Sequence, residues 1–180
     1  ELTAQLELAL TQINGREKQI IVIPCHEHEA PRCHFSEEVL YDDFLGRGDL
    51  HDSWVLPESE WEAYGLNYTS GTGGTPKGVV IHHRGAYLMA MGTVPAWTVP
   101  QHPVYLYTVP MFHCNGWGHA WLNALVAGSI ICLKKINASA IFDAISEHKV
   151  THFGGAPVVL GLLINAPEND QKTIKHTVNV

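Results

Sequence analysis

The stretch Tyr68–Gly78, with the sequence YTSGTGGTPKG, decides how the rest of the chain is interpreted. Apolar segments that are typical of strands, Gly65–Tyr68 and Val79–His82, lie on either side of it. Its glycines allow successive backbone N–H groups to point into one concavity, its hydroxyl side chains add donors, and Lys77 adds a positive charge. The stretch therefore suits a polyphosphate, although an ordinary surface turn rich in glycine and threonine would have the same composition.

A Walker A phosphate loop is disfavoured by the two neighbours of Lys77. That motif has glycine immediately before the lysine and serine or threonine immediately after it, and the hydroxyl group ligates Mg²⁺. Here Pro76 precedes the lysine and Gly78 follows it. The stretch therefore lacks the residues on which Walker A chemistry depends.

Strand and helix patterns alternate beyond Tyr64. The strand candidates are short apolar segments: Gly65–Tyr68, Val79–His82, Val104–Thr108, Ser129–Leu133 and Val150–Phe153. The helix candidates have apolar residues at helical spacing: Gly85–Val94, Gly118–Val126, Ser139–His148 and Pro157–Ile164. This alternation indicates an α/β fold with a mostly parallel sheet and crossover helices.

The region before Tyr64 is less regular. Apolar residues recur at helical spacing between Leu2 and Ile13, and Gln19–Ile23 is typical of a short strand. The polar region that follows has one predicted helix, Ser36–Leu45, whose first serine suits an N-cap. These segments predict a helix, a strand and a polar connection, and no extended core.

Two parts of the chain are therefore expected. Residues 1–63 form the N-terminal helix, strand and polar connecting region, and residues 64–180 form a partial α/β subdomain that is truncated at its C-terminus. Ile174–Val180 is typical of the opening of a further strand, and the chain stops inside it. A truncated sheet would expose an edge and apolar faces, so we expect the isolated chain to self-associate.

Composition and charge exclude several classes of protein. Of the 180 residues, 46% are hydrophobic and 16% are charged, and the formal net charge is -7. Wholesale disorder is disfavoured because the chain can build a core, and general nucleic-acid binding is disfavoured because there is no basic excess. Contact with phosphate must therefore be local, as the stretch Tyr68–Gly78 suggests.

Membrane and secretory locations are also disfavoured. The richest apolar run, Leu122–Leu133, is interrupted by polar residues and glycine and falls short of the roughly 18 apolar residues of a membrane helix. The first ten residues have neither a basic region nor a continuous apolar one, so no secretory signal is visible. Four cysteines in a chain of this length favour reduced thiols, and we expect a cytoplasmic protein.

The phosphate-binding stretch resembles that of the adenylate-forming, AMP-binding acyl-CoA synthetases, whose loop is T-S-G-T-T-G-x-P-K-G. The matching residues are Thr69, Ser70, Gly71, Thr72, Gly74, Pro76, Lys77 and Gly78. Three later segments, Val79–Gly85, Val109–Trp117 and Thr151–Pro157, are also similar to the family. The chain looks closest to the medium-chain and methylmercaptopropionate-CoA ligase-like branch. The resemblance implies a fragment of the large N-terminal domain, which is layered as α/β/α.

The reaction that this resemblance implies has two steps. A carboxylate attacks the α-phosphate of ATP, with Mg²⁺ bound, to give an acyl-adenylate and pyrophosphate, and coenzyme A then displaces AMP. By resemblance, Thr69 helps to hold Mg²⁺. The resemblance also implies that Ser70, Gly71, Thr72, Gly74 and Lys77 cradle the β- and γ-phosphates, and Gly73 is counted with this cofactor-binding set. The junction of the acyl chain and the nucleotide is lined by His113, Cys114 and Trp117. Lys77 and His113 are the candidate catalytic residues, with His113 as a donor or orienting group.

Two departures from the family pattern bear on activity. Gly73 stands where the family has a second threonine, which removes one hydroxyl donor from the loop. The later family motifs, which supply a second Mg²⁺ ligand, a ribose ligand and the adenylation lysine, are absent from the 180 residues. We therefore expect the isolated chain to be inactive. A noncatalytic nucleotide- or acyl-binding module is the alternative that the residues leave open.

Three other polar clusters have simpler interpretations. A metal site could be built from Cys25, His26, His28, Cys33 and His34, but their spacing matches no usual pair of zinc-ligand motifs. His82–Arg84 follows a predicted strand and suits a strand-to-helix junction better than an anion site. Glu147–Lys149 suits the C-terminus of a helix, where cations oppose the helix dipole.

Overall fold

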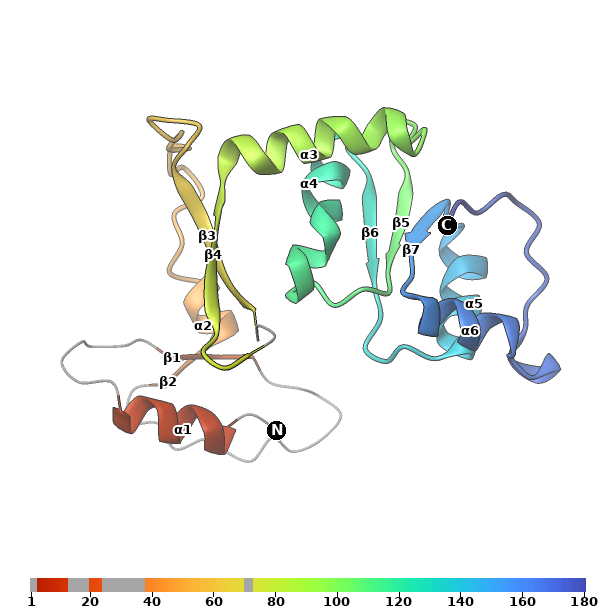
Figure 1. Cartoon of the computed structure of the whole chain (residues 1–180), viewed down its shortest axis with the longest axis horizontal. Helices are drawn as coiled ribbons and strands as arrows, with labels where there is room; N and C mark the ends of the chain where they lie inside the picture. The colour runs from red at the N-terminus through yellow and green to blue at the C-terminus, as the bar shows by residue number, and fades with distance from the viewer. Residues whose placement is uncertain (1–2, 13–19, 24–37, 70–72) are drawn as a thin grey trace. The chain divides into compact units, whose positions relative to one another are not determined.

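The computed structural model describes residues 3–12, 20–23, 38–69 and 73–180 (Figure 1). The chain divides into two compact units, residues 1–55 and 56–180. The boundary expected at residue 64 refers to the α/β subdomain and stays a prediction. In the first unit, the described elements are α1 (Thr3–Gln12), β1 (Ile20–Val22), β2 (Glu38–Leu40) and α2 (Tyr41–Leu45). β1 pairs in parallel with β2.

The helix predicted over Ser36–Leu45 is wrong in its first half. Glu38–Leu40 forms β2, and only Tyr41–Leu45 is helical. Val39 lies opposite Ile21 of β1 in the parallel pair. A partner strand that is distant in sequence thus overrides the local helix signals, which is the usual limit of propensity arguments. Ser36 and Glu37 lie outside the described residues.

The second unit begins with a hairpin. β3 (Ala63–Thr69) pairs with β4 (Lys77–His82) in an antiparallel register, with Thr69 opposite Lys77. The expectation of parallel strands is wrong for this pair. A parallel connection needs a crossover of a dozen or more residues, whereas the loop 70–76 is short enough only for a hairpin. The predicted phosphate loop is therefore the turn of this hairpin.

A parallel sheet follows the hairpin. The remaining elements are α3 (His83–Ala96), β5 (Val104–Tyr107), η1 (His113–Gly118), α4 (His119–Leu125), β6 (Ser129–Cys132), α5 (Ala138–His148), β7 (His152–Gly154), α6 (Pro157–Ile164) and η2 (Glu168–Asp170). The strand order is β6-β5-β7, and both pairs are parallel. Every strand and helix predicted between residues 65 and 164 is present, with bounds that differ by a few residues. The α/β prediction is therefore confirmed.

β5 lies at the centre of this sheet and separates two packed layers. Leu106 is fully buried in the main core with residues of α5, such as Ile141 and Ile145. Its neighbour Tyr105 instead contacts His119, the first residue of α4. Because successive residues of a strand point to opposite faces, α5 and the start of α4 cover opposite faces of the sheet. Figure 1 shows α4 beside β6, with α5 and α6 on the β7 side.

Hydrogen bonds cap both ends of α5, and its C-terminus lies where it was expected. The side-chain oxygen of Asn137 accepts a hydrogen bond from the N–H of Ala140 at 2.8 Å and begins the helix. Lys149 adopts the left-handed conformation (φ 56) that ends it, and the Lys149 ammonium donates to the carbonyl of Ser146 at 2.7 Å. The interpretation of Glu147–Lys149 as a helix C-terminus is confirmed.

The strand opening expected over Ile174–Val180 is present only as a single bridge to β7. Only Asn179 bridges to the sheet, in parallel with His152, and its backbone exchanges hydrogen bonds with Phe153 and Thr151. β7 is three residues long, so it offers a short edge for pairing. The apolar pattern of the segment is therefore not enough to extend the sheet.

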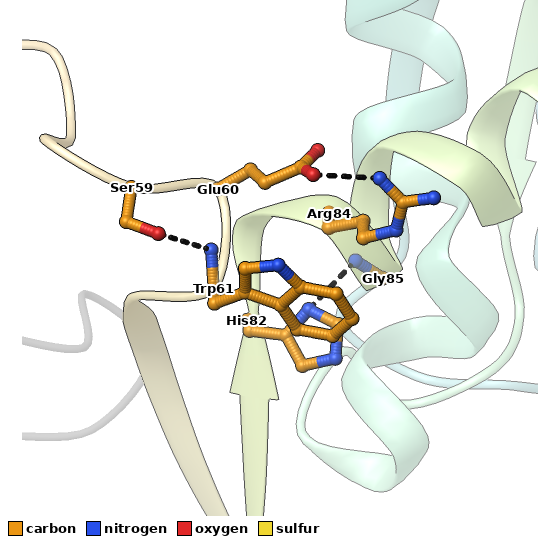
Figure 2. A network of polar contacts seen from close by, with 6 residues as sticks. All are labelled: Ser59, Glu60, Trp61, His82, Arg84 and Gly85. Carbon is orange, nitrogen blue, oxygen red and sulfur yellow. Dashed lines mark hydrogen bonds and ion pairs between the residues drawn. The ribbon is translucent and has the colours of Figure 1, made fainter.

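The interpretation of His82–Arg84 as a strand-to-helix junction is confirmed (Figure 2). The Nδ1 atom of His82 accepts a hydrogen bond from the N–H of Gly85 at 3.0 Å and caps α3. Arg84 pairs with Glu60 at 2.6 Å and lies over the ring of Trp61. The guanidinium is thus engaged in anchoring residues 59–62 to the start of α3.

A histidine and aromatic cluster fills the face of the sheet opposite α5. It consists of Trp97, Tyr105, His119 and His152, and the Trp97 ring centroid lies 5.4 Å from that of His119 and 5.2 Å from that of His152. The Tyr105 hydroxyl accepts a hydrogen bond from the N–H of Gly154 at 3.1 Å and is hydrogen-bonded to Nδ1 of His119. Both hydrogen bonds form when the Tyr105 hydroxyl accepts from Gly154 and donates to an unprotonated Nδ1 of His119. A neutral His119 suits this arrangement, because its burial disfavours the charged form.

Acidification should destabilise this cluster. Burial lowers the pKa of His119 and of His152 below the ordinary value of 6.5. Below that pH the unfolded chain binds more protons than the folded chain, so the free energy of unfolding falls as the pH falls. We expect the thermal midpoint, followed by tryptophan fluorescence, to drop by several degrees between about pH 7 and pH 5. In the double variant His119→Gln with His152→Gln, the slope of the thermal midpoint against pH should be smaller. His148→Gln, at an exposed position, is the control and should keep the wild-type slope; equal slopes in all three proteins would contradict the prediction.

Candidate functional site

The hairpin holds both ends of the phosphate loop. Thr69 is the last residue of β3, and Lys77, the first residue of β4, lies opposite it in the register. Between them, Gly73 and Gly74 are exposed, and Gly74 has a φ of 111, a conformation that side chains rarely adopt. Ser70, Gly71 and Thr72 lie outside the described residues. The described part of the loop is thus a glycine turn with a hydroxyl at one end and an ammonium at the other.

Gly73 has room for a larger residue. A Cβ atom built on it would meet nothing within 4 Å, and its φ lies outside the left-handed region. The glycine that replaces the family threonine is therefore not required by close packing. Gly74 is different, because its positive φ would strain any side chain whatever the space around it.

η1 concentrates unusual backbone conformations. Cys114 and Trp117 have φ values of 47 and 56, in the left-handed region that favours glycine, and Gly116 and Gly118 are also left-handed. Each non-glycine residue in such a conformation costs about 1–3 kcal/mol and persists only where the surroundings hold it. Such residues cluster at ligand sites, which makes η1 the second candidate segment of the site.

Cavity A, as we name it, has a volume of about 620 Å³ and joins the two segments. Thr69 from the phosphate loop and His113 and Cys114 from η1 all line it. Its remaining wall is mostly apolar and aromatic, and the rings of Tyr64 and Trp121 meet edge to face at 5.4 Å. Three predicted site residues, from two segments that are far apart in sequence, therefore share one cavity.

Cavity B, of about 370 Å³, opens at the carboxyl ends of β5 and β7. Thr108–Pro110 follow β5, Ala156 follows β7, and His113 and Trp117 of η1 complete that side. Val158 and Leu162 of α6 make the rest of the wall largely apolar. Ligands of parallel α/β sheets bind at this edge, so cavity B is the natural place for an apolar group.

His113 lines both cavities, and its side chain is exposed. An imidazole at this position can donate to or orient a polar group that lies between an apolar ligand in cavity B and a phosphate near Thr69. The remaining predicted residues, Gly73, Gly74 and Lys77, line neither cavity. The described structure thus brings Thr69, His113 and Cys114 together, adds Trp117 through cavity B, and leaves Lys77 at the base of the loop.

Sequence reasoning missed part of the cavity walls. Phe112 lies inside a segment that resembles the family, so the resemblance could have pointed to it. Met89 and Trp121 come from α3 and α4 and carry no local signal.

Within the described ranges, no group of three or more His, Cys, Asp or Glu residues is placed to hold a metal ion, and no helix is long and apolar enough to cross a membrane. The predicted cluster Cys25–His34 lies outside those ranges.

Comparison with known proteins gives the family. A model of the AMP-binding enzyme family matches residues 3–179. An acetate/butyrate–CoA ligase of Arabidopsis thaliana, named as peroxisomal, is 48% identical over 141 residues, which are 78% of this chain and 25% of that protein. A 2-methylpropanoate–CoA ligase of Humulus lupulus is 50% identical over 140 residues, with the same coverage. The chain therefore spans about a quarter of the length of these relatives.

Solved structures give the fold. An inhibitor-bound N-terminal domain of FACL13 from Mycobacterium tuberculosis has a TM-score of 0.68 at 22% identity and covers 84% of this chain and 38% of that one. A fatty acyl CoA synthetase of the same organism also has a TM-score of 0.68, at 20% identity, and covers 93% of this chain and 34% of that one. The fold prediction is confirmed by these likenesses. Because the family model spans nearly all of its residues, the chain belongs to the AMP-binding enzyme family.

Proposed function

We propose that this chain is part of an ATP-dependent acyl-CoA synthetase, which activates a carboxylate as an acyl-adenylate and then transfers the acyl group to coenzyme A. The observation that carries the proposal is that Thr69 and His113, from two segments distant in sequence, line cavity A. The names of the relatives support a CoA ligase. No comparison favours the noncatalytic nucleotide- or acyl-binding module, which is not proposed.

The loop is assigned to the pyrophosphate of ATP. Backbone N–H groups at Gly73 and Gly74 and the Lys77 ammonium supply fixed dipoles and charge where negative charge develops on the leaving group. The Thr69 hydroxyl would help to hold Mg²⁺, which takes few protein oxygens and is otherwise bound by water and substrate phosphates. The ion would neutralise phosphate charge. A single exposed hydroxyl at the end of β3 fits that role.

The acyl group is assigned to cavity B. Its apolar wall suits a hydrocarbon chain, and His113, which borders both cavities, would orient the carboxylate toward the α-phosphate. With about 370 Å³, the cavity accommodates a short chain, in keeping with the acetate, butyrate and 2-methylpropanoate in the names of the relatives. The finer resemblance to methylmercaptopropionate-CoA ligases has no such support and stays a prediction.

Location and assembly complete the proposal. A cytoplasmic location is expected from the cysteine content, whereas two of the relatives are named peroxisomal, so both compartments are consistent with the family. Self-association stays a prediction. It is in keeping with the exposed apolar side chains of α6, which include Val158 and Ile164.

Replacing Lys77 tests the assignment of the loop. Lys77→Ala removes a charged donor to phosphate, and such contacts are worth about 1.5–3 kcal/mol, so MgATP should bind at least roughly tenfold more weakly. Isothermal titration calorimetry on the 180-residue chain measures the change. Lys175→Ala, an exposed lysine outside the loop with the same change in charge, is the matched control. Equal weakening in both variants, or none in Lys77→Ala, would count against the proposal.

The isolated chain should bind ligands without completing the first reaction. It spans about a quarter of the length of its relatives, and the family residues that follow in order supply further contacts to Mg²⁺ and ribose. We expect no carboxylate-dependent release of pyrophosphate from the 180 residues with MgATP and butyrate. A coupled pyrophosphate assay, with an active acyl-CoA synthetase as positive control, measures it. Release above the blank would refute this expectation.

Restoring the family threonine should strengthen ATP binding. Gly73→Thr adds a hydroxyl donor where a Cβ meets nothing within 4 Å. One added hydrogen bond to a charged phosphate predicts MgATP affinity that is about tenfold higher. Gly65→Thr, on β3 with equally open space, is the matched control and should leave the affinity unchanged. Titration calorimetry compares the MgATP affinity of the three proteins. An unaltered affinity in Gly73→Thr would contradict the prediction.

A further inference from the structure

We propose that Tyr105, His119 and Thr108 are positioning residues for cavity B, because they fix Gly154 at the place where its bare Cα sets the position of the Trp117 ring. The inference rests on the proposed function, since it takes cavity B as the acyl site. Tyr105 and His119 lie behind the cavity wall, whereas Thr108 is part of it.

Both polar groups of Gly154 are held by side chains. Its N–H donates to the Tyr105 hydroxyl at 3.1 Å, and its carbonyl accepts a hydrogen bond from the Thr108 hydroxyl. The Tyr105 hydroxyl is in turn bonded to Nδ1 of His119. All three side chains are buried, with exposed fractions of 1% for Tyr105, 4% for Thr108 and 8% for His119. The last residue of β7 is therefore fixed on both sides by a dry hydrogen-bonded network.

Gly154 lies where a larger residue would be tightly packed. A Cβ atom built on it would lie 3.3 Å from Cζ3 of Trp117, 3.2 Å from the Tyr105 hydroxyl and 3.3 Å from Cε1 of His119. Such distances are closer than ordinary van der Waals contact, so the Trp117 ring packs on the bare Cα. Any shift of Gly154 must therefore be passed to that ring.

The placement of Trp117 depends on this packing. Its φ of 56 is unfavourable for a non-glycine residue, so this conformation persists only where the surroundings hold it. The ring is 40% exposed and lines cavity B, and its inner edge meets Gly154 and the ring of His119, whose centroid lies 6.3 Å away. Loss of the network should thus let the cavity wall move.

Tyr105 and His119 do not line cavity B themselves, which makes the inference testable. A loss of ligand affinity on changing Tyr105 cannot come from a lost contact to the ligand. A second threonine offers a matched control. Thr151 also bridges β5 and β7 with its hydroxyl, at 3.0 Å from the N–H and 3.2 Å from the carbonyl of Val104, at the opposite end of the strand pair.

The experiment titrates sodium butyrate into the ¹⁵N-labelled chain and follows the indole N–H of Trp117, assigned with Trp117→Phe. In Tyr105→Phe and Thr108→Val we expect a shifted indole resonance and butyrate affinity lower by roughly fivefold, the effect of about one lost hydrogen bond. Thr108→Ser, which keeps the hydroxyl, should retain the wild-type resonance. Thr151→Val should lower the thermal midpoint while leaving the resonance and the affinity unchanged.

The outcomes separate this inference from the proposed function. An unchanged resonance and affinity in Tyr105→Phe, or an equal loss of affinity in Thr151→Val, would overturn the positioning role. If the wild-type chain binds no butyrate, the acyl assignment of cavity B fails, and the shift of the Trp117 resonance alone decides whether the network positions the ring. If Tyr105→Phe does not fold, Thr108→Val is compared with Thr108→Ser. A Trp117 indole resonance that is shifted in Thr108→Val and unchanged in Thr108→Ser supports the positioning role. The same resonance in both variants overturns it.

Discussion

The pairing of β5 with a parallel neighbour on each side is the constraint on which the second unit depends. A strand that is hydrogen-bonded on both edges can bury both of its faces, and β5 does so with Leu106 on one face and Tyr105 on the other. The first face makes the main core with α5, and the second makes the histidine and aromatic cluster. Since the strand also leads into Thr108–Pro110, the same pairing that builds the core determines where the wall of cavity B begins.

The hairpin supplies the second constraint. A phosphate loop needs a backbone that approaches its ligand closely, which glycine allows, but glycine also gives the loop freedom that weakens any site. The pairing of Thr69 with Lys77 limits that freedom by fixing both ends at one register position. The proposed phosphate site is compatible with an acidic chain, because its charge and dipoles would be concentrated in one turn.

The local elements could be predicted from the sequence where the signal is local. The pattern of apolar residues indicated the bounds of α6, Pro157–Ile164, and the resemblance indicated the loop. The errors in the predicted helices and strands occur where pairing with a strand distant in sequence determines the structure. Glu38–Leu40 becomes a strand because β1 accepts it, and Ile174–Val180 joins β7 only through the bridge at Asn179. Cavity walls such as Met89 and Trp121 could not be predicted, since their roles arise only from packing.

The network around Gly154 explains why a family motif is an incomplete description of a site. Trp117 and His113 fall inside a segment that resembles the family, but the left-handed φ of Trp117 needs surroundings that hold it. The ring is held by a glycine from β7, and that glycine is held by a tyrosine from β5 and by the threonine that follows this strand. A motif names the residues that face the ligand, whereas the strands behind them determine how firmly those residues are held. Differences in acyl preference among relatives with the same motif can therefore arise from residues that never touch the acyl chain.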